Sequence, residues 1–223
     1  MRPAGTRISN QNTKRTSHYI TDVFDNRILS PGIEFAEPEE FIRRYDGGGG
    51  LLQNYEVSYS GLSDALSDAL AYNVILIPIC QIVGDIEVPA TVTVKGQSRR
   101  STKLYGTVTL NDGSVLENFT IDNNTTNIAN PSVGVYGPVS GYNEEDPTIP
   151  ALAFLYSMTI DVGSTAGPAY AVWLTCGGIT AYDTELLAVE GVPGYAAYVQ
   201  FGTFTHYSGR AVGTEAAPYF LAI

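Results

Sequence analysis

The stretch KLYGTVTLNDGSVLENFTI, residues 103–121, carries the clearest structural pattern in the chain. Apolar and polar residues alternate on both sides of an Asn-Asp-Gly sequence, which is the side-chain period of a β-strand interrupted by a preferred turn. The alternating apolar residues are Leu104, Val108 and Leu110 before the turn, and Val115, Phe119 and Ile121 after it. The pattern predicts two antiparallel strands joined as a hairpin.

Similar short apolar runs occur on both sides of this stretch. They lie at residues 54–59, 74–83, 86–94, 152–162, 168–176, 184–190 and 194–207. About ten short strands separated by turn residues are typical of sandwiches, jelly rolls and barrels. We therefore expect an all-β fold, with residues 51–223 forming an antiparallel sandwich or jelly-roll-like domain, and we expect residues 122–150 to be a long polar loop.

One helix interrupts the strands. In SGLSDALSDALAY, residues 60–72, Leu62, Leu66 and Leu70 recur at four-residue spacing, which places them on one helical face. Asp64 and Asp68 lie on the opposite face. The spacing predicts one short amphipathic helix.

The first fifty residues differ from the rest of the chain. They are poor in aliphatic residues, lack a clear period and end in four glycines, Gly47–Gly50. We expect residues 1–50 to form an extended N-terminal arm with a flexible glycine linker, and EPEEFIRRY (37–45) to add a short helix. The apolar segment APYFLAI (217–223) is expected to dock as a strand.

Charge is distributed unevenly along the chain. The net charge is −11, and residues 104–209 contain ten Asp and Glu but no Lys or Arg. Because affinity for nucleic acid comes largely from Lys and Arg that neutralise phosphates, we expect no such partner beyond weak contacts of the arm.

Residues that could carry catalysis are sparse. Only His18 and His206 are available as imidazole ligands, and no metal or cofactor is predicted. Ser140 and Ser208 lack the glycine spacing of a nucleophile elbow. Cys80 and Cys176 are expected to be buried free thiols, with a disulfide as the alternative. The sequence predicts a protein that is not an enzyme.

The layout of arm, β domain and apolar C-terminus resembles small virion structural proteins, both jelly-roll coat subunits and phage cement or decoration proteins. The resemblance implies passive assembly with other copies or another virion protein, location in a virion made in a host cytoplasm, and no membrane partner. The expected interface residues are charged residues of the arm, of a basic cluster at residues 95–103 and of an acidic stretch at residues 144–146: Arg2, Arg7, Lys14, Arg15, Arg43, Arg44, Arg99, Arg100, Glu144, Glu145 and Asp146.

Two alternatives stay open. A carbohydrate- or receptor-binding module would use tyrosines, with Tyr136 and Tyr142 in the predicted loop as candidates, because tyrosine combines a large contact area with a polar tip. A β-sandwich glycoside hydrolase would need only two carboxylates. The acids near strands are Glu117, Asp122, Asp161, Asp183, Glu185 and Glu190, and the sequence ranks no pair above another.

Overall fold

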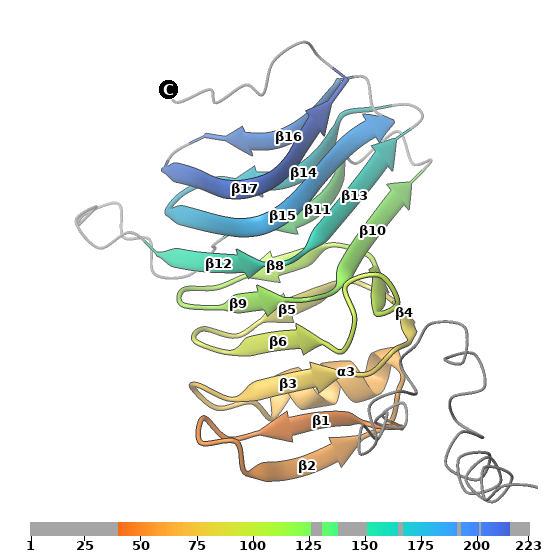
Figure 1. Cartoon of the computed structure of the whole chain (residues 1–223), viewed down its shortest axis with the longest axis vertical. Helices are drawn as coiled ribbons and strands as arrows, with labels where there is room; N and C mark the ends of the chain where they lie inside the picture. Colours follow the sequence, from red (N-terminus) through yellow and green to blue (C-terminus); the bar gives the residue numbers. More distant parts are fainter. Residues whose placement is uncertain are drawn as a thin grey trace, which may run out of the picture. The chain divides into compact units, whose positions relative to one another are not determined.

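Most strands pair in parallel, and they repeat along one axis (Figure 1). The computed structural model describes residues 40–125, 131–137, 151–164, 167–190, 193–200 and 202–214. The chain passes repeatedly through three strand positions, and each turn of the coil stacks on the one before it. Successive turns are called rungs, and the three strand positions are called faces A, B and C.

Faces A and B belong to one twelve-stranded sheet. The strands of face A are β3 (Val74–Ile77), β6 (Thr93–Gly96), β9 (Val115–Glu117), β12 (Leu152–Tyr156), and the first parts of β15 (Gly178–Glu190) and β17 (Thr203–Gly213). The strands of face B are β4 (Gln81–Val83), β7 (Lys103–Tyr105), β10 (Thr120–Thr125), β13 (Thr159–Ser164), and the second parts of β15 and β17.

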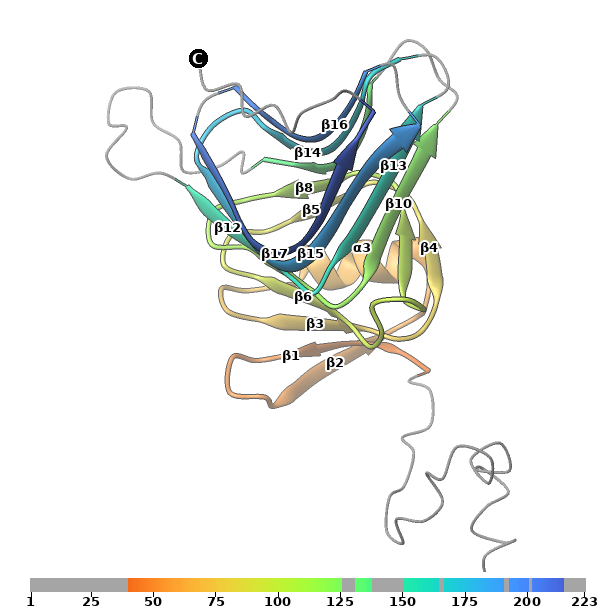
Figure 2. The same cartoon turned by 45° about the horizontal axis from the view of Figure 1, so that its top comes forward.

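Face C is a separate five-stranded sheet. Its strands are β5 (Ile86–Val88), β8 (Val108–Leu110), β11 (Ser132–Tyr136), β14 (Ala169–Leu174) and β16 (Gly194–Val199). Figures 1 and 2 show face C behind face A, and the chain winds with a right-handed sense, as parallel crossover connections do. The described residues between 74 and 213 therefore form a parallel β-solenoid.

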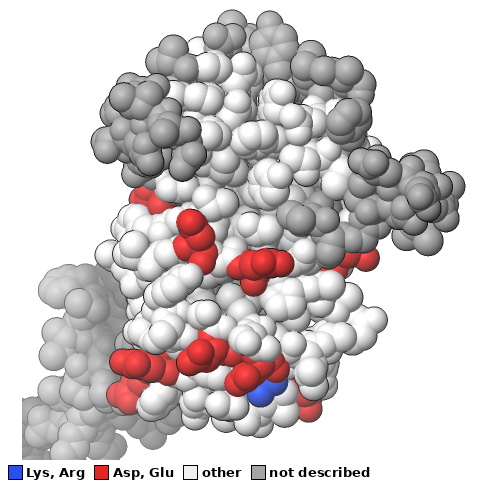
Figure 3. Space-filling model, turned by 180° about the vertical axis from the view of Figure 1, so that it is seen from behind, with Lys and Arg blue, Asp and Glu red and all other residues white. Residues whose placement is uncertain are grey.

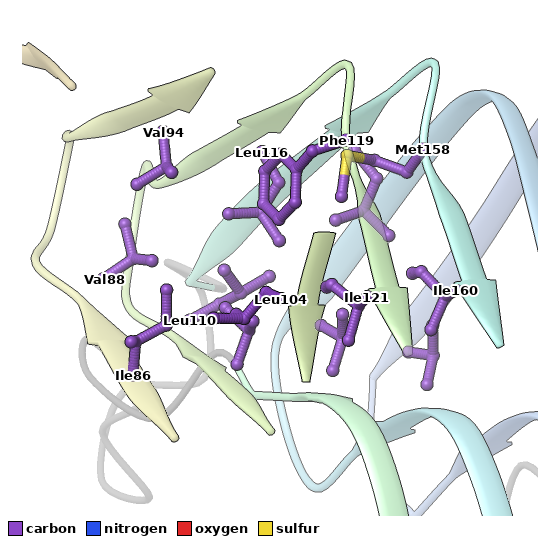
Figure 4. Close-up of a cluster of buried hydrophobic side chains, with 14 of the residues drawn as sticks. Ile86, Val88, Val94, Leu104, Leu110, Leu116, Phe119, Ile121, Met158 and Ile160 are labelled. Carbon is purple, nitrogen blue, oxygen red and sulfur yellow. The ribbon is translucent and has the colours of Figure 1, made fainter. Parts of the chain in front are cut away.

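The interior is filled by aliphatic side chains from all three faces (Figure 4). On face A the inward positions stack in register as Ile75, Val94, Leu116, Leu155 and Ala181, each at most 1% exposed. Faces B and C supply equivalent buried columns. The alternation read from the sequence is thus the alternation between the solenoid interior and solvent.

A hairpin and a helix precede the first rung. β1 (Ile42–Tyr45) and β2 (Leu51–Tyr55) pair antiparallel, and β1 continues the sheet by pairing antiparallel with β3. The helix α3 (Tyr59–Ser67) buries Leu62, Ala65 and Leu66. Ser58 caps it by accepting a hydrogen bond from the Gly61 N–H at 3.1 Å.

The all-β class is confirmed, but the predicted antiparallel pairing is not what the described strands show. Apart from the two pairs that involve β1, every pair of strands in the described residues is parallel. The predicted hairpin at 103–121 is wrong, because β8 and β9 lie in different sheets. Residues 111–114 instead form a corner from face C to face A, where the Asp112 carbonyl accepts from Thr91 N–H of the previous rung at 2.8 Å.

Three local predictions also change. Residues 42–45 are a strand rather than part of a helix. Gly47–Gly50 form the tight turn between β1 and β2, in which the Asp46 carboxylate accepts from the N–H groups of Gly48 and Gly50. The predicted loop at 122–150 contains the end of β10 and all of β11. Residues 1–39 and the apolar segment 217–223 lie outside the described residues.

The single helix was predicted four residues too long. It ends at Ser67, and Leu70 is 70% exposed instead of continuing the apolar face. The Asn73 side chain explains the end, since its Oδ1 accepts from the Leu70 N–H at 3.1 Å and so stabilises a turn after the helix.

Candidate ligand-binding face

Face C presents a row of in-register side chains to solvent. Strand pairing aligns Glu87, Thr109, Tyr136, Trp173 and Tyr198 on five successive rungs. Their neighbours in each strand point into the core, so the row is a consequence of the strand alternation. This set is called the outer row.

A pair of stacked tyrosine rings lies beside the outer row. Tyr170 of β14 and Tyr195 of β16 are paired in register, and their rings stack with centroids 5.3 Å apart and planes 7° apart. Together with three residues of the outer row they make a continuous group, called the aromatic face. Its members are Tyr136, Tyr170, Trp173, Tyr195 and Tyr198.

The rings of the aromatic face support one another edge to face. Trp173 lies between Tyr136 and Tyr198, with centroid distances of 5.8 and 5.9 Å and interplanar angles of 81° in both contacts. Such T-shaped pairs are favourable because a positive ring edge meets a negative ring face. All five side chains are half-buried rather than enclosed, so part of each remains accessible to solvent.

Tyr170 lies in a setting that changes its pKa. Burial raises the pKa of Tyr170 above its usual value of 10.0, and the nearby Tyr195 and Tyr198 raise it further. Both causes favour the protonated phenol, which can donate a hydrogen bond.

A pocket of about 650 Å³ opens at the lower end of the outer row. Tyr59, Ser63 and Ser67 of α3 form one wall, and Asp85, Glu87 and Asn111 contribute polar groups from face C and its corners. Asn111 Nδ2 donates to Glu87 Oε1 at 2.9 Å and thereby fixes the carboxylate. Asp85 Oδ1 accepts from the Thr107 N–H at 2.7 Å.

Face C is acidic at this end and carries no cation in its strands. The five strands contain Glu87 but no Lys or Arg. Seen from behind, acidic groups gather over the lower half of this side, whereas the upper half is largely free of charge where residues are described (Figure 3).

Face A carries a different aromatic arrangement. Tyr156, Tyr182 and Tyr207 occupy one outward position on three rungs, and their rings stack at 5.1 and 4.8 Å with planes 4° and 8° apart. In such a ladder each inner ring is covered on both faces by its neighbours. The ladder therefore stabilises the solenoid more than it offers a surface for stacking.

The predicted interface residues that the structure describes are mostly engaged within the chain. Arg44 donates to Tyr55 Oη at 3.0 Å and to the Asp68 carbonyl at 2.7 Å, which ties β1 and β2 to the end of α3. Arg99 donates to Thr159 Oγ1 and pairs with Asp183 and Glu185 at 3.4 and 3.6 Å. Arg43 lies in β1, and Arg100 lies exposed in the loop before β7.

Of the remaining predicted residues, the structure describes only one. Tyr136 is part of the aromatic face. The others lie outside the described residues: Arg2, Arg7, Lys14, Arg15, Tyr142, Glu144, Glu145 and Asp146. The interface prediction itself stays a prediction.

The structure describes the surroundings of five of the six carboxylates that the sequence left equal, and the side chain of Glu190 lies outside the description. Asp122 and Asp161 are direct partners on adjacent strands of face B, about 4.8 Å apart along the solenoid. Glu117 pairs with Lys95 at 2.6 Å, and Asp183 and Glu185 pair with Arg99. The described part of the chain contains no group of three or more His, Cys, Asp or Glu able to hold a metal ion. Both cysteines are free and half-buried.

Sequence reasoning missed most of the aromatic face, although a signal was present. AYAVWL (169–174) and GYAAYV (194–199) share a pattern of small residue, Tyr, two small or aliphatic residues, aromatic residue and aliphatic residue. The two segments are 25 positions apart, which is one rung. Aligning them would have placed Tyr170 over Tyr195 and Trp173 over Tyr198.

These features define a parallel β-solenoid with an aromatic face and an acidic pocket on one side. Searches against protein-family models, curated proteins and solved structures found no match. No helix among the described residues has the length and apolar character needed to span a membrane.

Proposed function

We propose that the β-solenoid is a glycan-binding module that holds a carbohydrate chain along face C. The observation that carries the proposal is the aromatic face, in which five half-buried rings from three successive strands lie side by side on one sheet. Sugar rings present apolar C–H surfaces to such rings, and tyrosine hydroxyls at the rim can exchange hydrogen bonds with sugar hydroxyls.

The regular register of the face C strands favours an extended ligand. From Tyr136 to Tyr198 the outer row advances one strand spacing per rung, so the rings follow a straight line parallel to the solenoid axis. A linear chain of sugars matches this line better than a compact ligand, which would need a deep cavity. The absence of Lys and Arg from the strands of face C argues against a nucleic acid in the same place.

Glycan-array binding followed by calorimetry tests the proposal. Trp173→Ala and Tyr198→Ala should each weaken binding of an array-selected oligosaccharide about tenfold or more, because each removes a stacking surface worth roughly 1.4 kcal/mol. Tyr207→Ala is the matched control, because it removes an outward ring from face A. Failure of the wild-type chain to bind any glycan, or equal losses in all three variants, would refute the proposal.

A second candidate function is assembly into a virion shell or fibre, and strand β17 favours it. β17 has eleven residues and pairs with β15, and its other edge has no strand partner among the described residues. A long edge with one charged residue, Arg210, and no proline is a template for pairing with another chain. The partner would be another copy of the chain or another virion protein, as the sequence led us to expect.

The assembly proposal has its own test. Thr205 is an outward residue of β17, and Thr93 occupies the same column on the central strand β6. Thr205→Lys should convert an assembled species to monomer in light scattering, whereas Thr93→Lys should not. A wild-type chain that is monomeric at every concentration would exclude assembly through β17 by itself. Removal of the predicted arm should stop at residue 39, because deleting residues 1–46 would also remove β1.

A further inference from the structure

The acidic pocket and the aromatic face are parts of one surface. Glu87 is the first member of the outer row and also lines the pocket beside α3. Four strand-to-strand steps separate Glu87 from Tyr198, a span of about 19 Å. A chain of sugars lying on the aromatic face would therefore enter the pocket at its lower end.

The pocket offers acceptors and an aromatic ring. Glu87 uses Oε1 to accept from Asn111, and Asp85 uses Oδ1 to accept from Thr107, so each carboxylate keeps a second oxygen that no described residue approaches as a donor. Both side chains are exposed. Tyr59 forms the opposite wall, 45% exposed, and its hydroxyl is held by the Asp85 carbonyl at 2.9 Å.

No positive charge balances these carboxylates within the pocket. None of the lining residues is Lys or Arg, and neither Asp85 nor Glu87 forms an ion pair with a described residue. A ligand group that supplies positive charge and several N–H donors fits this lining, because it can pair with both carboxylates and lie against the tyrosine ring.

We infer that the pocket binds the ammonium group of an amino sugar, and that the glycan held on face C contains units with a free amine. The inference rests on the proposed glycan-binding function and specifies the ligand class. An N-acetylated unit would bring an uncharged amide into the pocket and would lack the charge-assisted hydrogen bonds that an ammonium group can donate to the two carboxylates. The pocket thus distinguishes free-amine from N-acetylated glycans of the same length and linkage.

Calorimetry on the full chain with two matched ligands tests this inference. The ligands are a β-1,4-linked glucosamine oligosaccharide and its fully N-acetylated form, measured at pH 6 in low salt. The wild-type chain should bind the amine form at least tenfold more tightly, and the difference should shrink as salt is added. Glu87→Gln and Asp85→Asn should each reduce the ratio of the affinity for the amine form to the affinity for the N-acetylated form.

The possible outcomes distinguish failure of the amino-sugar inference from failure of the proposed glycan-binding function. Equal affinity for the two ligands in the wild-type chain, with binding that is lost in Trp173→Ala, would overturn the inference and leave the proposed function standing. No binding of any glycan would overturn both. A calcium titration in place of the sugar gives the remaining outcome, since tight calcium binding that is lost in Glu87→Gln would show that the pocket serves a metal ion and would overturn the inference.

Discussion

At the scale of single residues, the corner between faces A and B explains several unusual choices in the sequence. Asn118, Ser157, Asp183 and Ser208 occupy this corner on four rungs, and all have positive φ, at 63°, 51°, 47° and 130°. Short polar residues tolerate the left-handed region better than branched or bulky ones. The corner can therefore repeat without glycine at every rung.

Asn118 stabilises the corner in two ways, because it adopts the positive φ and its side chain forms a hydrogen bond. Two substitutions distinguish these contributions. Its Nδ2 donates to the Gly96 carbonyl of the previous rung at 2.9 Å. Asn118→Ala should lower the free energy of unfolding by about 2 kcal/mol, because it loses this bond and strains the backbone. Asn118→Gly should cost only about 1 kcal/mol, since glycine accepts the positive φ. Urea denaturation measures both, and a glycine variant as unstable as the alanine variant would contradict the conformational part.

Cys80 should make stability depend on pH in alkaline solution. Burial raises the pKa of Cys80 from 9.0 to about 11. The folded state therefore favours the neutral thiol, and this contribution is complete below pH 9 and is lost as pH rises through about 11. Wild type should lose stability relative to Cys80→Ala between pH 9 and pH 11.

Urea denaturation across this pH range provides the measurement. Burial also raises the pKa of Tyr156 and Tyr170, so both proteins lose stability at high pH and only their difference reports on Cys80. Cys176→Ala serves as the control and should follow the wild-type profile. A constant difference between wild type and Cys80→Ala over the whole range would contradict the assignment.

At the scale of elements, the sequence predicts where most strands lie but not which strands pair. Alternation in residues 103–121 correctly marks five of its six apolar residues as buried: Leu104, Val108, Leu110, Phe119 and Ile121. The sixth, Val115, lies on the outward side of β9, and its neighbour Leu116 is buried instead. It contains no information about the partner strand, because parallel and antiparallel strands share the same side-chain period. Asn111-Asp112-Gly113 favours a tight turn in either case, and here the turn leads to another sheet.

The rungs are also too irregular to be recognised as a repeat. The equivalent residues Val74, Thr93, Val115, Phe154, Thr180 and Thr205 are separated by 19, 22, 39, 26 and 25 positions. A fixed period is the usual sequence sign of a solenoid, and it is absent here. The irregular spacing also hides the aromatic face in the sequence, because its rings come from three strands and lie together only when the rungs are stacked.

The helix before the first rung depends on a single cap that can be tested. Ser58 accepts from the Gly61 N–H, and α3 has no acidic residue in its first turn to compensate for a lost cap. Ser58→Ala should lower the free energy of unfolding by about 1 kcal/mol in urea denaturation. Ser63→Ala, at an exposed position within the same helix, should change it by less than about 0.5 kcal/mol. Equal effects of the two changes would argue against the cap.

At the scale of the whole solenoid, each rung contacts mainly the rungs next to it. Every described parallel strand pair joins neighbouring passes of the coil. Stability in such structures is close to a sum of rung terms and neighbour terms, so the ends can open while the middle stays folded. Among the described residues the first rung is continued by β1 and β2, whereas β17 has one strand neighbour.

This difference predicts that truncating an apolar side chain destabilises only the nearby strands when the residue lies in β17. The same truncation in a middle rung should destabilise the whole solenoid. Leu155 is fully buried in β12, with in-register partners on both sides, so Leu155→Ala should cost about 2–5 kcal/mol and speed amide exchange in all rungs. Phe204 of β17 is only partly buried against the core, so Phe204→Ala should speed exchange in β17 and the paired β15 while leaving β6 and β9 unchanged. Hydrogen exchange read by mass spectrometry resolves the segments. Equal acceleration across all strands in Phe204→Ala would show that the solenoid unfolds as one cooperative unit, because the loss at its end would then have spread through every rung.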